Sequence, residues 1–220
     1  MAILNFSDVT RFIKFIRNTE GKKTTAEIRF LLHDGRSLSR LCNNAYKGTD
    51  IIRQMYEKFG DLIKGIYLTI NPIDTKLLQG RTTARDRDIS HINFIAIDID
   101  SVKAETDQSA TDREKSHARQ LAKSLCNYLK LEGFEEPDLI IDSGNGYHIY
   151  FRTEVIENRL LTSEFLKALS SVKSTAHAKI DTNVANPSRI MRIPGTYARK
   201  GENTEERPWR LSKIIEEGQL

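Results

Sequence analysis

Two aspartates stand two positions apart at the end of the most apolar segment of the chain. This segment, 92–100, reads INFIAIDID and ends with Asp98, Ile99 and Asp100. Alternate side chains of a strand point to the same face of a sheet, so both carboxylates share one face, about 7 Å apart at their Cα atoms. Neighbouring buried carboxylates repel each other and lose hydration, so they need a compensating cation. A divalent ion such as Mg²⁺ fits this pair, and pairing with arginines is the alternative.

A second group of candidate residues lies in 139–151, which reads LIIDSGNGYHIYF. Asn145-Gly146 is the favoured pair for a tight type I′ turn, so the segment is predicted to be a β-hairpin. A two-residue turn at this pair places Ser143 directly opposite His148. A hydroxyl and an imidazole beside a glycine-rich backbone suit the binding of a triphosphate, although the hairpin could be purely structural. Acyl transfer by serine and histidine is not supported, because no nucleophile elbow is present.

A third carboxylate precedes two arginines. Asp181 ends the short segment HAKID, and Arg189 and Arg192 follow it after eight and eleven residues. The acid could add a metal ligand, and the arginine forks suit phosphate oxygens. On a regular strand the two arginines would face opposite sides, so at least one needs a turn or bulge, and Pro194-Gly195 supplies a nearby break. A solvated basic loop is the simpler alternative.

The elements that must position these residues can be predicted from hydrophobic periodicity and turn signals. Their mixed order favours antiparallel or mixed sheets with packed helices over a doubly wound parallel fold. Helices are predicted at about 7–18 (capped by Ser7 or Asp8), 49–59, 112–131, 162–172 and 209–217, strands at 25–32, 37–41, 65–70, 92–100, 138–142 and 147–152, a loop at 73–91, and irregular structure with short strands at 177–200.

The order of the three groups resembles the catalytic motifs of the archaeo-eukaryotic primase superfamily. Its first motif is DxD or DxE, its second is SxH-like, and its third is a hydrophobic pair before Asp. Three residues, Asn145-Gly146-Tyr147, widen the second motif here, as in the primase-polymerase branch found in plasmids and phages. The segments YLTINP and RIMRIPGT are also similar to that branch. The resemblance covers about residues 65–213, and the first 60 residues show no confident match.

The resemblance implies an α+β fold, the archaeo-eukaryotic primase catalytic core, with mixed or antiparallel sheets, an RRM-like catalytic subdomain and packed helices. It implies a single primase-polymerase catalytic domain over 1–220, with an N-terminal α/β part at about 1–64 and the motif-bearing region at 65–213. The implied activity is template-directed nucleotidyl transfer from NTP or dNTP to a 3′-hydroxyl, which makes or extends primers on single-stranded DNA.

The resemblance also implies roles for individual residues. It assigns the catalytic metal-binding role to Asp98, Asp100 and Asp181, with two divalent ions, Mg²⁺ or Mn²⁺, as cofactors and no zinc. It assigns binding of the incoming nucleotide to Ser143, Gly144, Asn145, His148, Arg189, Arg192 and Lys200.

The implied partners are a single-stranded or primed DNA template and NTP or dNTP, with a helicase or accessory domain if the chain belongs to a longer protein. Basic loops and exposed aromatic side chains bind single strands without sequence preference. The loop 81–88, which contains Arg81, Arg85 and Arg87, is therefore a candidate template contact. Two other classes of function stay open: a non-catalytic single-stranded-DNA-binding module of a replication initiator, and a metal-dependent nuclease or DxD glycosyltransferase that uses the same acids.

The amino-acid composition indicates which broad class of protein this is. The chain has 220 residues, 39% hydrophobic and 29% charged, which is typical of a soluble globular protein. Its net charge of +4 is compatible with nucleic-acid binding. Its two cysteines, Cys42 and Cys126, form no CxxC pair, so we do not expect a zinc site. Two unpaired thiols suggest a reducing compartment. No apolar run of about 20 residues and no signal peptide is present, so we expect a cytoplasmic protein without a membrane partner.

Overall fold

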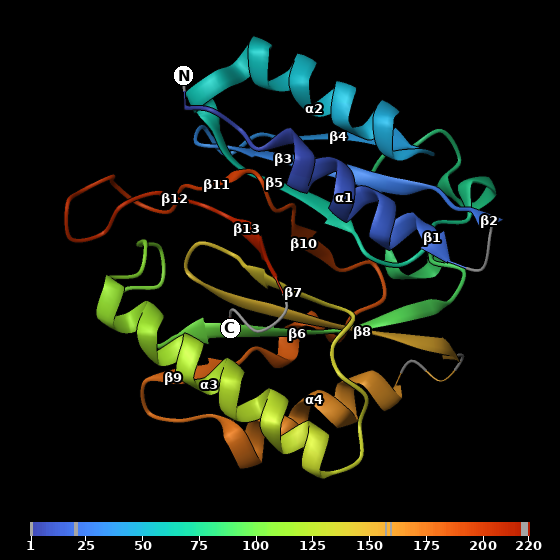
Figure 1. The fold of residues 1–220 in the computed structure, drawn as a ribbon. Coiled ribbons are helices and arrows are strands. Elements are labelled where there is room, and N and C mark those ends of the chain that lie inside the picture. The colour runs from blue at the N-terminus through green and yellow to red at the C-terminus, as the bar shows by residue number, and fades with distance from the viewer. Residues whose placement is uncertain (1, 20–21, 157, 159, 217–219) are drawn as a thin grey trace.

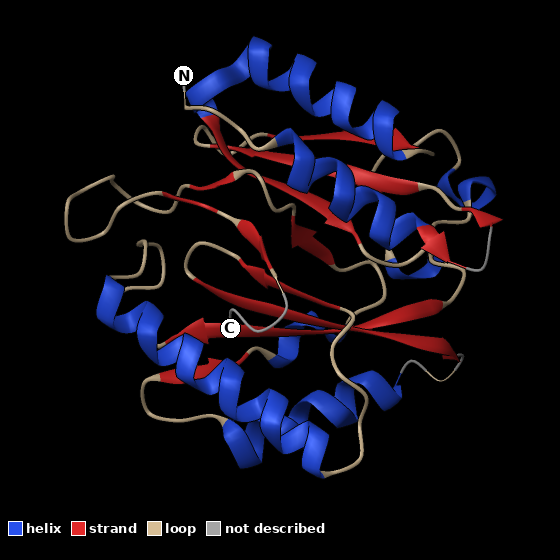
Figure 2. Ribbon diagram, viewed as in Figure 1, coloured by secondary structure: helices blue, strands red, loops and turns tan. Residues whose placement is uncertain are grey.

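The computed structural model describes residues 2–19, 22–156, 158, 160–216 and 220. Its elements form two main antiparallel sheets with helices packed against them (Figures 1 and 2). The four-stranded sheet has the order β10-β5-β3-β4. Its strands are β3 (Ala26–Leu32), β4 (Ser37–Cys42), β5 (Ile63–Thr69) and β10 (Ile190–Arg192), and the helices beside it are α1 (Phe6–Arg17) and α2 (Ala45–Phe59).

The five-stranded sheet carries most of the residues singled out in the sequence. It has the order β13-β7-β8-β6-β9, and α3 and α4 lie below it in Figure 1. Its elements are β6 (Ile92–Ser101), β7 (Leu139–Asp142), β8 (Gly146–Ile156), β9 (Ala178–Ile180) and β13 (Lys213–Ile215), with α3 (Asp112–Leu131) and α4 (Leu160–Lys173).

Shorter elements complete the fold. They are the two-stranded pairs β1 (Asn18–Thr19) with β2 (Lys22–Lys23) and β11 (Tyr197–Ala198) with β12 (Arg210–Leu211), and the 3-10 turns η1 (Gly60–Leu62), η2 (Thr75–Leu78), η3 (Asp86–Asp88) and η4 (Thr182–Ala185). None of the described helices is both long and apolar enough to cross a membrane.

Side chains of β6 alternate between a face that packs on the helices of its sheet and a face that carries Asp98 and Asp100, as the sequence predicts. Ile97 and Ile99 are fully buried on the face toward α3. Phe94 lies on the other face, where its ring centroid is 5.1 Å from that of Phe15 in α1. Because α1 fills one end of the space between the sheets, the carboxylates of β6 lie at the other end of this face.

The longest helix begins and ends where the sequence predicts. Thr111 caps α3 and forms a capping box with Glu114, in which each side chain accepts a backbone N–H of the other residue. Such reciprocal caps satisfy two donors that the first helical turn leaves free. The helix α1 also matches its predicted range, but its cap is wrong: Asn5 Oδ1, not Ser7 or Asp8, accepts the first backbone amides, at 3.1 and 3.2 Å.

The predicted helix at 209–217 is wrong for its described residues, and residue 217 lies outside them. The strand β12 pairs with β11, and β13 pairs with β7, with Lys213 opposite Asp142. Between them Ser212 donates its backbone amide to the carbonyl of Thr196 at 2.9 Å. The segment forms strands because two sheet edges offer it backbone partners, which outweighs its helical periodicity.

Candidate active site

A small polar cavity of about 110 Å³ lies between the two sheets. Strands β6 and β8 and the turn before β8 form one wall, and β5 and β10 form the other. The lining residues are Tyr67, Asp98, Asp100, Ser143, Asn145, His148, Ile190, Met191, Arg192 and Lys200. Most residues that the sequence singled out therefore converge here, whereas Gly144, Asp181 and Arg189 lie outside the lining.

A row of three side chains crosses the five-stranded sheet beside this cavity. In the β6–β8 register Asp98 is opposite His148, and the two side chains approach to 3.6 Å between His148 Nε2 and Asp98 Oδ1. On the other side of β6, the backbone amide of Asp181 donates to the carbonyl of Asp98 at 2.8 Å. The third acid, distant in sequence, thus lies directly beside the first.

The carboxyl of Asp98 is held in an unfavourable place for its charge. Burial raises its pKa well above the ordinary value of 3.8, and the nearby Asp100 and Asp181 raise it further. Lys200 and Arg189 oppose this shift but do not cancel it. A bound cation would reverse the balance, because it stabilises the ionised form of each carboxyl around it.

The oxygen donors suit a hard divalent ion, and burial together with the neighbouring carboxylates leaves the pKa of Asp98 raised despite Lys200 and Arg189. The carboxylate of Asp181, however, caps η4: its Oδ1 accepts from the backbone and the side chain of Asn183, both at 2.9 Å. Within the described residues, no three His, Cys, Asp or Glu side chains are already arranged around one metal position. The fit therefore rests on Asp98 and Asp100, with Asp181 adjacent.

His148 is buried as a neutral imidazole. Its side chain is 6% exposed, and burial, followed by the charge of Arg192, lowers its pKa from 6.5 to about 3. Its Nδ1 lies 3.4 Å from the hydroxyl of Tyr150. A neutral ring offers one donor and one acceptor, so His148 can donate to a phosphate oxygen without adding charge.

The burial of His148 makes the stability of the fold depend on pH. The unfolded chain binds a proton to this residue below its ordinary pKa of 6.5, whereas the folded chain does so only near 3. Between these values the unfolded state holds more protons, so the free energy of unfolding falls as pH falls, by up to about 1.4 kcal/mol per pH unit.

Urea unfolding of the wild type and His148→Asn in metal-free buffer tests this. We expect the stability of the wild type relative to the variant to fall by about 2 kcal/mol between about pH 7.5 and pH 5. A difference that stays constant over this range would show that His148 is not buried in its neutral form.

The hairpin that carries His148 turns one residue earlier than predicted. Asp142 pairs with Tyr147 and Ile141 pairs with His148, so Ser143 is not opposite His148. Ser143 instead accepts the backbone amide of Gly146 through Oγ at 3.2 Å. The two central residues are Gly144, with φ +94°, and Asn145, so a glycine at the first position replaces the predicted Asn-Gly turn.

Three contacts explain this register. A Cβ at Gly146 would lie 2.0 Å from the carbonyl oxygen of Ile99, so this glycine is required in the strand, where β8 approaches β6. Asn145 is buried, and its Oδ1 accepts the amide of Ala110 at 2.8 Å. Gly144 faces the β11–β12 pair, because a Cβ there would lie 2.7 Å from the Cβ of Ala198.

The opposite wall of the cavity contributes Arg192 and a residue that the sequence did not single out. The guanidinium of Arg192 donates to the hydroxyl of Tyr67 at 2.8 Å and to the carbonyl of Tyr197 at 3.0 Å. It also lies 4.9 Å from the ring centroid of Tyr67. Tyr67 is the first residue of the YLTINP segment. Only the pairing of β5 with β10, which places Tyr67 opposite Arg192, shows that it belongs to the site.

Arg189, the first of the two arginines, lies directly before β10, and a turn at 187–188 precedes it. The strand runs in regular register from Ile190 to Arg192, so no turn or bulge separates the two arginines and they face different sides. The backbone amide of Arg189 donates to Asn186 at 3.0 Å, and its guanidinium donates to the carbonyl of Asn183. Asp86 fixes this segment, because its Oδ1 accepts from Ser188 Oγ at 2.6 Å and from Asn186 Nδ2 at 3.2 Å. Arg189 is therefore held near Asp98 but outside the cavity.

The basic loop predicted to contact a template is partly used by the fold itself. Arg81 donates to both oxygens of the buried Asp88, at 3.0 and 3.1 Å. Arg85 and Arg87 are exposed. The Nε of Arg87 lies 3.9 Å from Asp88 Oδ1, a looser contact than the two bonds of Arg81.

Comparison with known proteins identifies the class of fold. A scan of protein-family models gives no match, and a search of curated proteins gives none. Among solved structures, the chain is similar in fold to primase and polymerase domains, which confirms the expected α+β fold with antiparallel sheets.

Three of these structures are a primase, the catalytic domain of a primase and a polymerase domain. The crystal structure of primase RepB′ has a TM-score of 0.57 and 13% identity over 96% of this chain, which spans 56% of the length of that primase. The catalytic domain of primase RepB′ with initiator DNA has a TM-score of 0.56 and 14% identity, over 96% of this chain and 84% of that one. The polymerase domain of Mycobacterium tuberculosis Ligase D with DNA has a TM-score of 0.52 and 11% identity, over 93% and 79%.

Proposed function

We propose that this chain is a primase-polymerase domain: a nucleotidyltransferase that makes or extends primers on single-stranded DNA from NTP or dNTP. One observation carries the proposal. The acids Asp98 and Asp100 line the same cavity as His148, Arg192 and Lys200, between the two sheets of a primase-like fold. Carboxylates that can bind a cation and side chains that can donate hydrogen bonds to phosphate thus line the same cavity.

In this reaction the 3′-hydroxyl oxygen of a primer or first nucleotide bonds to the α-phosphorus. The bond from that phosphorus to its bridging oxygen breaks, its electron pair leaves with pyrophosphate, and the hydroxyl proton is released to water. Two divalent ions, Mg²⁺ or Mn²⁺, would lower the pKa of the hydroxyl and stabilise the leaving oxygen when bound. Such a transfer needs positioning and electrostatic stabilisation rather than a protein nucleophile, and none is evident in this cavity.

The chain's own residues would divide this work. Asp98 and Asp100 would hold the cation, with Asp181 beside them. His148, Ser143 and the guanidinium of Arg192 would bind phosphate oxygens. Since ligand pockets of about 300–1,000 Å³ enclose a whole small molecule, a cavity of about 110 Å³ accommodates only part of a nucleotide, and its polar lining suits the phosphates.

Extension of a 5′-labelled primer tests the proposal. The purified chain is incubated with Mg²⁺ or Mn²⁺ and either NTP or dNTP on primed and unprimed single-stranded DNA, and products are separated on a denaturing gel. We expect strands longer than the primer, or new strands on unprimed template. Shorter strands would indicate a nuclease, and DNA binding without any product would indicate a binding module, so either result would overturn the proposal.

Replacing His148 by alanine should chiefly weaken nucleotide binding. A hydrogen bond from the imidazole to a charged phosphate contributes about 1.5–3 kcal/mol, so we expect the nucleotide KM to rise by about tenfold or more with a smaller change in kcat. His117→Ala is the matched control, since His117 packs against His177, 4.8 Å between ring centroids, and does not line the cavity. A KM for His148→Ala equal to that of the control would remove His148 from the nucleotide site.

A further inference from the structure

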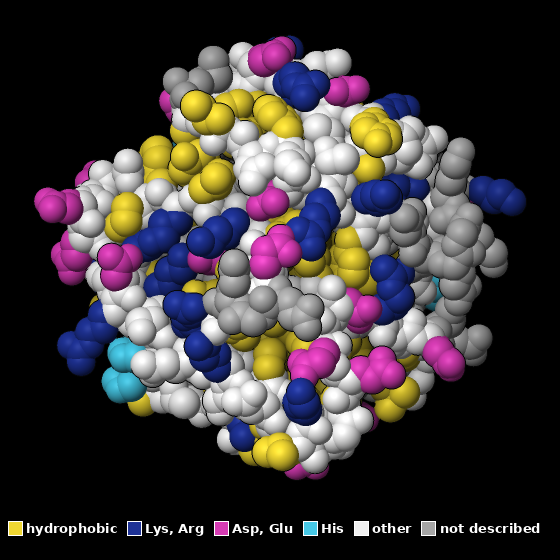
Figure 3. Space-filling view, in the orientation of Figure 1, with side chains coloured by type: hydrophobic (Ala, Val, Ile, Leu, Met, Phe, Trp, Pro, Cys, Tyr) yellow, Lys and Arg dark blue, Asp and Glu magenta, His cyan; other side chains and the backbone are white. Residues whose placement is uncertain are grey.

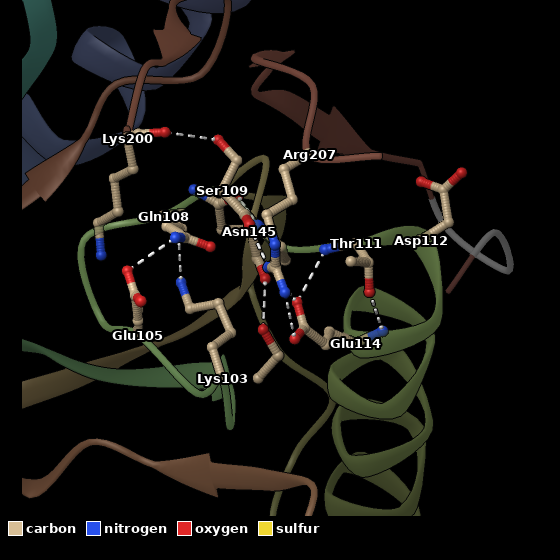
Figure 4. A network of polar contacts seen from close by, with 12 residues as sticks. Lys103, Glu105, Gln108, Ser109, Thr111, Asp112, Glu114, Asn145, Lys200 and Arg207 are labelled. Atoms are coloured by element: carbon tan, nitrogen blue, oxygen red, sulfur yellow. Dashed lines mark hydrogen bonds and ion pairs between the residues drawn. The ribbon is translucent and has the colours of Figure 1, made fainter. Parts of the chain in front are cut away.

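The loop that follows Asp100, residues 101–111, lies beside Lys200 of the cavity lining and is held in place at several points (Figure 4). Ser109 donates its backbone amide and its hydroxyl to the carbonyl of Lys200, both at 3.1 Å. Arg207 donates to the carbonyl of Ser109 and to the carboxylate of Glu114, both at 2.8 Å. These bonds join the loop to the start of α3 and to the chain after β11.

Two lysines extend from this framework with their ammonium groups on the same side of it (Figure 4). Lys200 lines the cavity beside Asp100. Lys103 is half-buried, and its Nζ donates to the carbonyl of Gln108 at 2.9 Å. Glu105 holds the same loop by accepting from Gln108 Nε2 at 2.7 Å.

The two ammonium groups lie close enough to repel each other. Burial and the charge of Lys200 lower the pKa of Lys103, whereas Asp100 and Glu114 raise it. Among the described residues neither lysine forms an ion pair, whereas Lys115 and Arg207 nearby bond to carboxylates at 2.7 and 2.8 Å. Two neighbouring half-buried cations, neither of them in an ion pair, favour the binding of an anion.

Lys and Arg side chains also gather near this loop, with Asp and Glu side chains at their outer edge (Figure 3). In Figure 3, Lys and Arg side chains gather on the left of the molecule, over the region where Figure 1 shows β12, β13 and the start of α3. A polyanion would be attracted to this face at moderate ionic strength.

We propose that Lys103 and Lys200 form a subsite for the two terminal phosphates of the incoming triphosphate, and for the pyrophosphate that leaves. Lys103 is the new member of this subsite. The inference rests on the proposed function, since the α-phosphate must then lie beside Asp98 and Asp100, and the tail extends past Asp100 toward the 101–111 loop. Lysine binds such a tail as a point charge, so the subsite recognises polyphosphate and not the base.

Binding of magnesium pyrophosphate by calorimetry, together with steady-state primer extension, tests the subsite in the full chain. We expect Lys103→Ala to weaken pyrophosphate binding and to raise the nucleotide KM by about tenfold or more, with little change in kcat. Lys103→Arg should retain most of the affinity. Binding of a nucleoside monophosphate, which lacks the terminal phosphates, should not change.

Lys123→Ala is the matched control, because Lys123 is an exposed lysine of α3 that does not line the cavity. If the wild type extends primers and Lys103→Ala binds pyrophosphate and nucleotide as the control does, the subsite is overturned while the proposed function stands. If Lys103→Ala weakens monophosphate and pyrophosphate binding equally, the subsite is overturned as well. A wild type that binds pyrophosphate but makes no product would instead overturn the proposed function.

Discussion

Asp98→Asn is expected to reduce nucleotide incorporation by about 10³-fold or more and to leave the protein folded. The amide keeps the shape of the side chain but removes the charge that would hold a cation against the triphosphate. A metal ion contributes several kcal/mol of transition-state stabilisation, and each 1.36 kcal/mol corresponds to a factor of ten in rate. The loss should appear in kcat on both primed and unprimed templates.

Stability should change in the opposite direction. The folded-state pKa of Asp98 is raised, so the ionised carboxyl costs stability at every pH above its ordinary value of 3.8, increasingly up to the folded-state pKa. We therefore expect Asp98→Asn to have a Tm at neutral pH equal to or above that of the wild type. Asp50→Asn, on the exposed face of α2, is the control and should leave the rate unchanged. Full activity in purified Asp98→Asn would remove this residue from the chemistry.

Gly146→Ala is expected to destabilise the fold by about 3 kcal/mol or more and to abolish activity with it. The added Cβ would lie 2.0 Å from the carbonyl oxygen of Ile99 and 3.4 Å from the Cα of Asp100. Both neighbours are backbone, so β6 and β8 must separate at the point where Asp98 meets His148. Overpacking against a rigid neighbour costs typically about 1–3 kcal/mol, and backbone overlap is at the upper end.

Gly35→Ala is the control that measures the stability lost when a glycine is replaced without steric overlap. Gly35 has φ +84° in the β3–β4 turn, and nothing lies within 4 Å of its Cβ position. We expect only the backbone strain there, about 1–2 kcal/mol. Urea unfolding of both variants measures the difference. If the two lose the same stability, Gly146 is not required by the contact between β6 and β8.

Local patterns were sufficient to predict the strand that carries the first two acids. The alternation in 92–100 fixes which face Asp98 and Asp100 share, because the side-chain period of a strand is two whatever its neighbours are. The helix at 112–131 was predictable for a similar reason, since its capping box is a local signal.

The register of the hairpin could not be predicted from local signals. Asn145-Gly146 is the favoured turn pair, but Asn145 bonds to Ala110 and Gly146 packs on Ile99, and both partners are distant in sequence. The same holds for residues 210–215, whose strands depend on β11 and β7 being available as edges. Contacts between distant segments therefore override the local preference.

The sequence predicted most of the residues that form the candidate site, but it could not predict how they are arranged in space. The sequence identified Arg189 and Arg192 as equivalent candidates, whereas the fold places only Arg192 in the cavity. Tyr67 stood within the noted YLTINP segment without a role of its own, and Lys103 carried no signal, because their positions matter only through Arg192 and Lys200 respectively.

Binding of Mn²⁺ in the presence of a non-hydrolysable nucleoside triphosphate, followed by electron paramagnetic resonance, tests the central claim most directly. The claim is that Asp98 and Asp100 hold a divalent cation against the triphosphate in the cavity between the sheets. We expect the wild type to bind Mn²⁺ at least about tenfold more tightly than Asp98→Asn or Asp100→Asn, since even residues that only orient metal ligands have effects of that size. Equal Mn²⁺ binding by the wild type and both variants would contradict the claim.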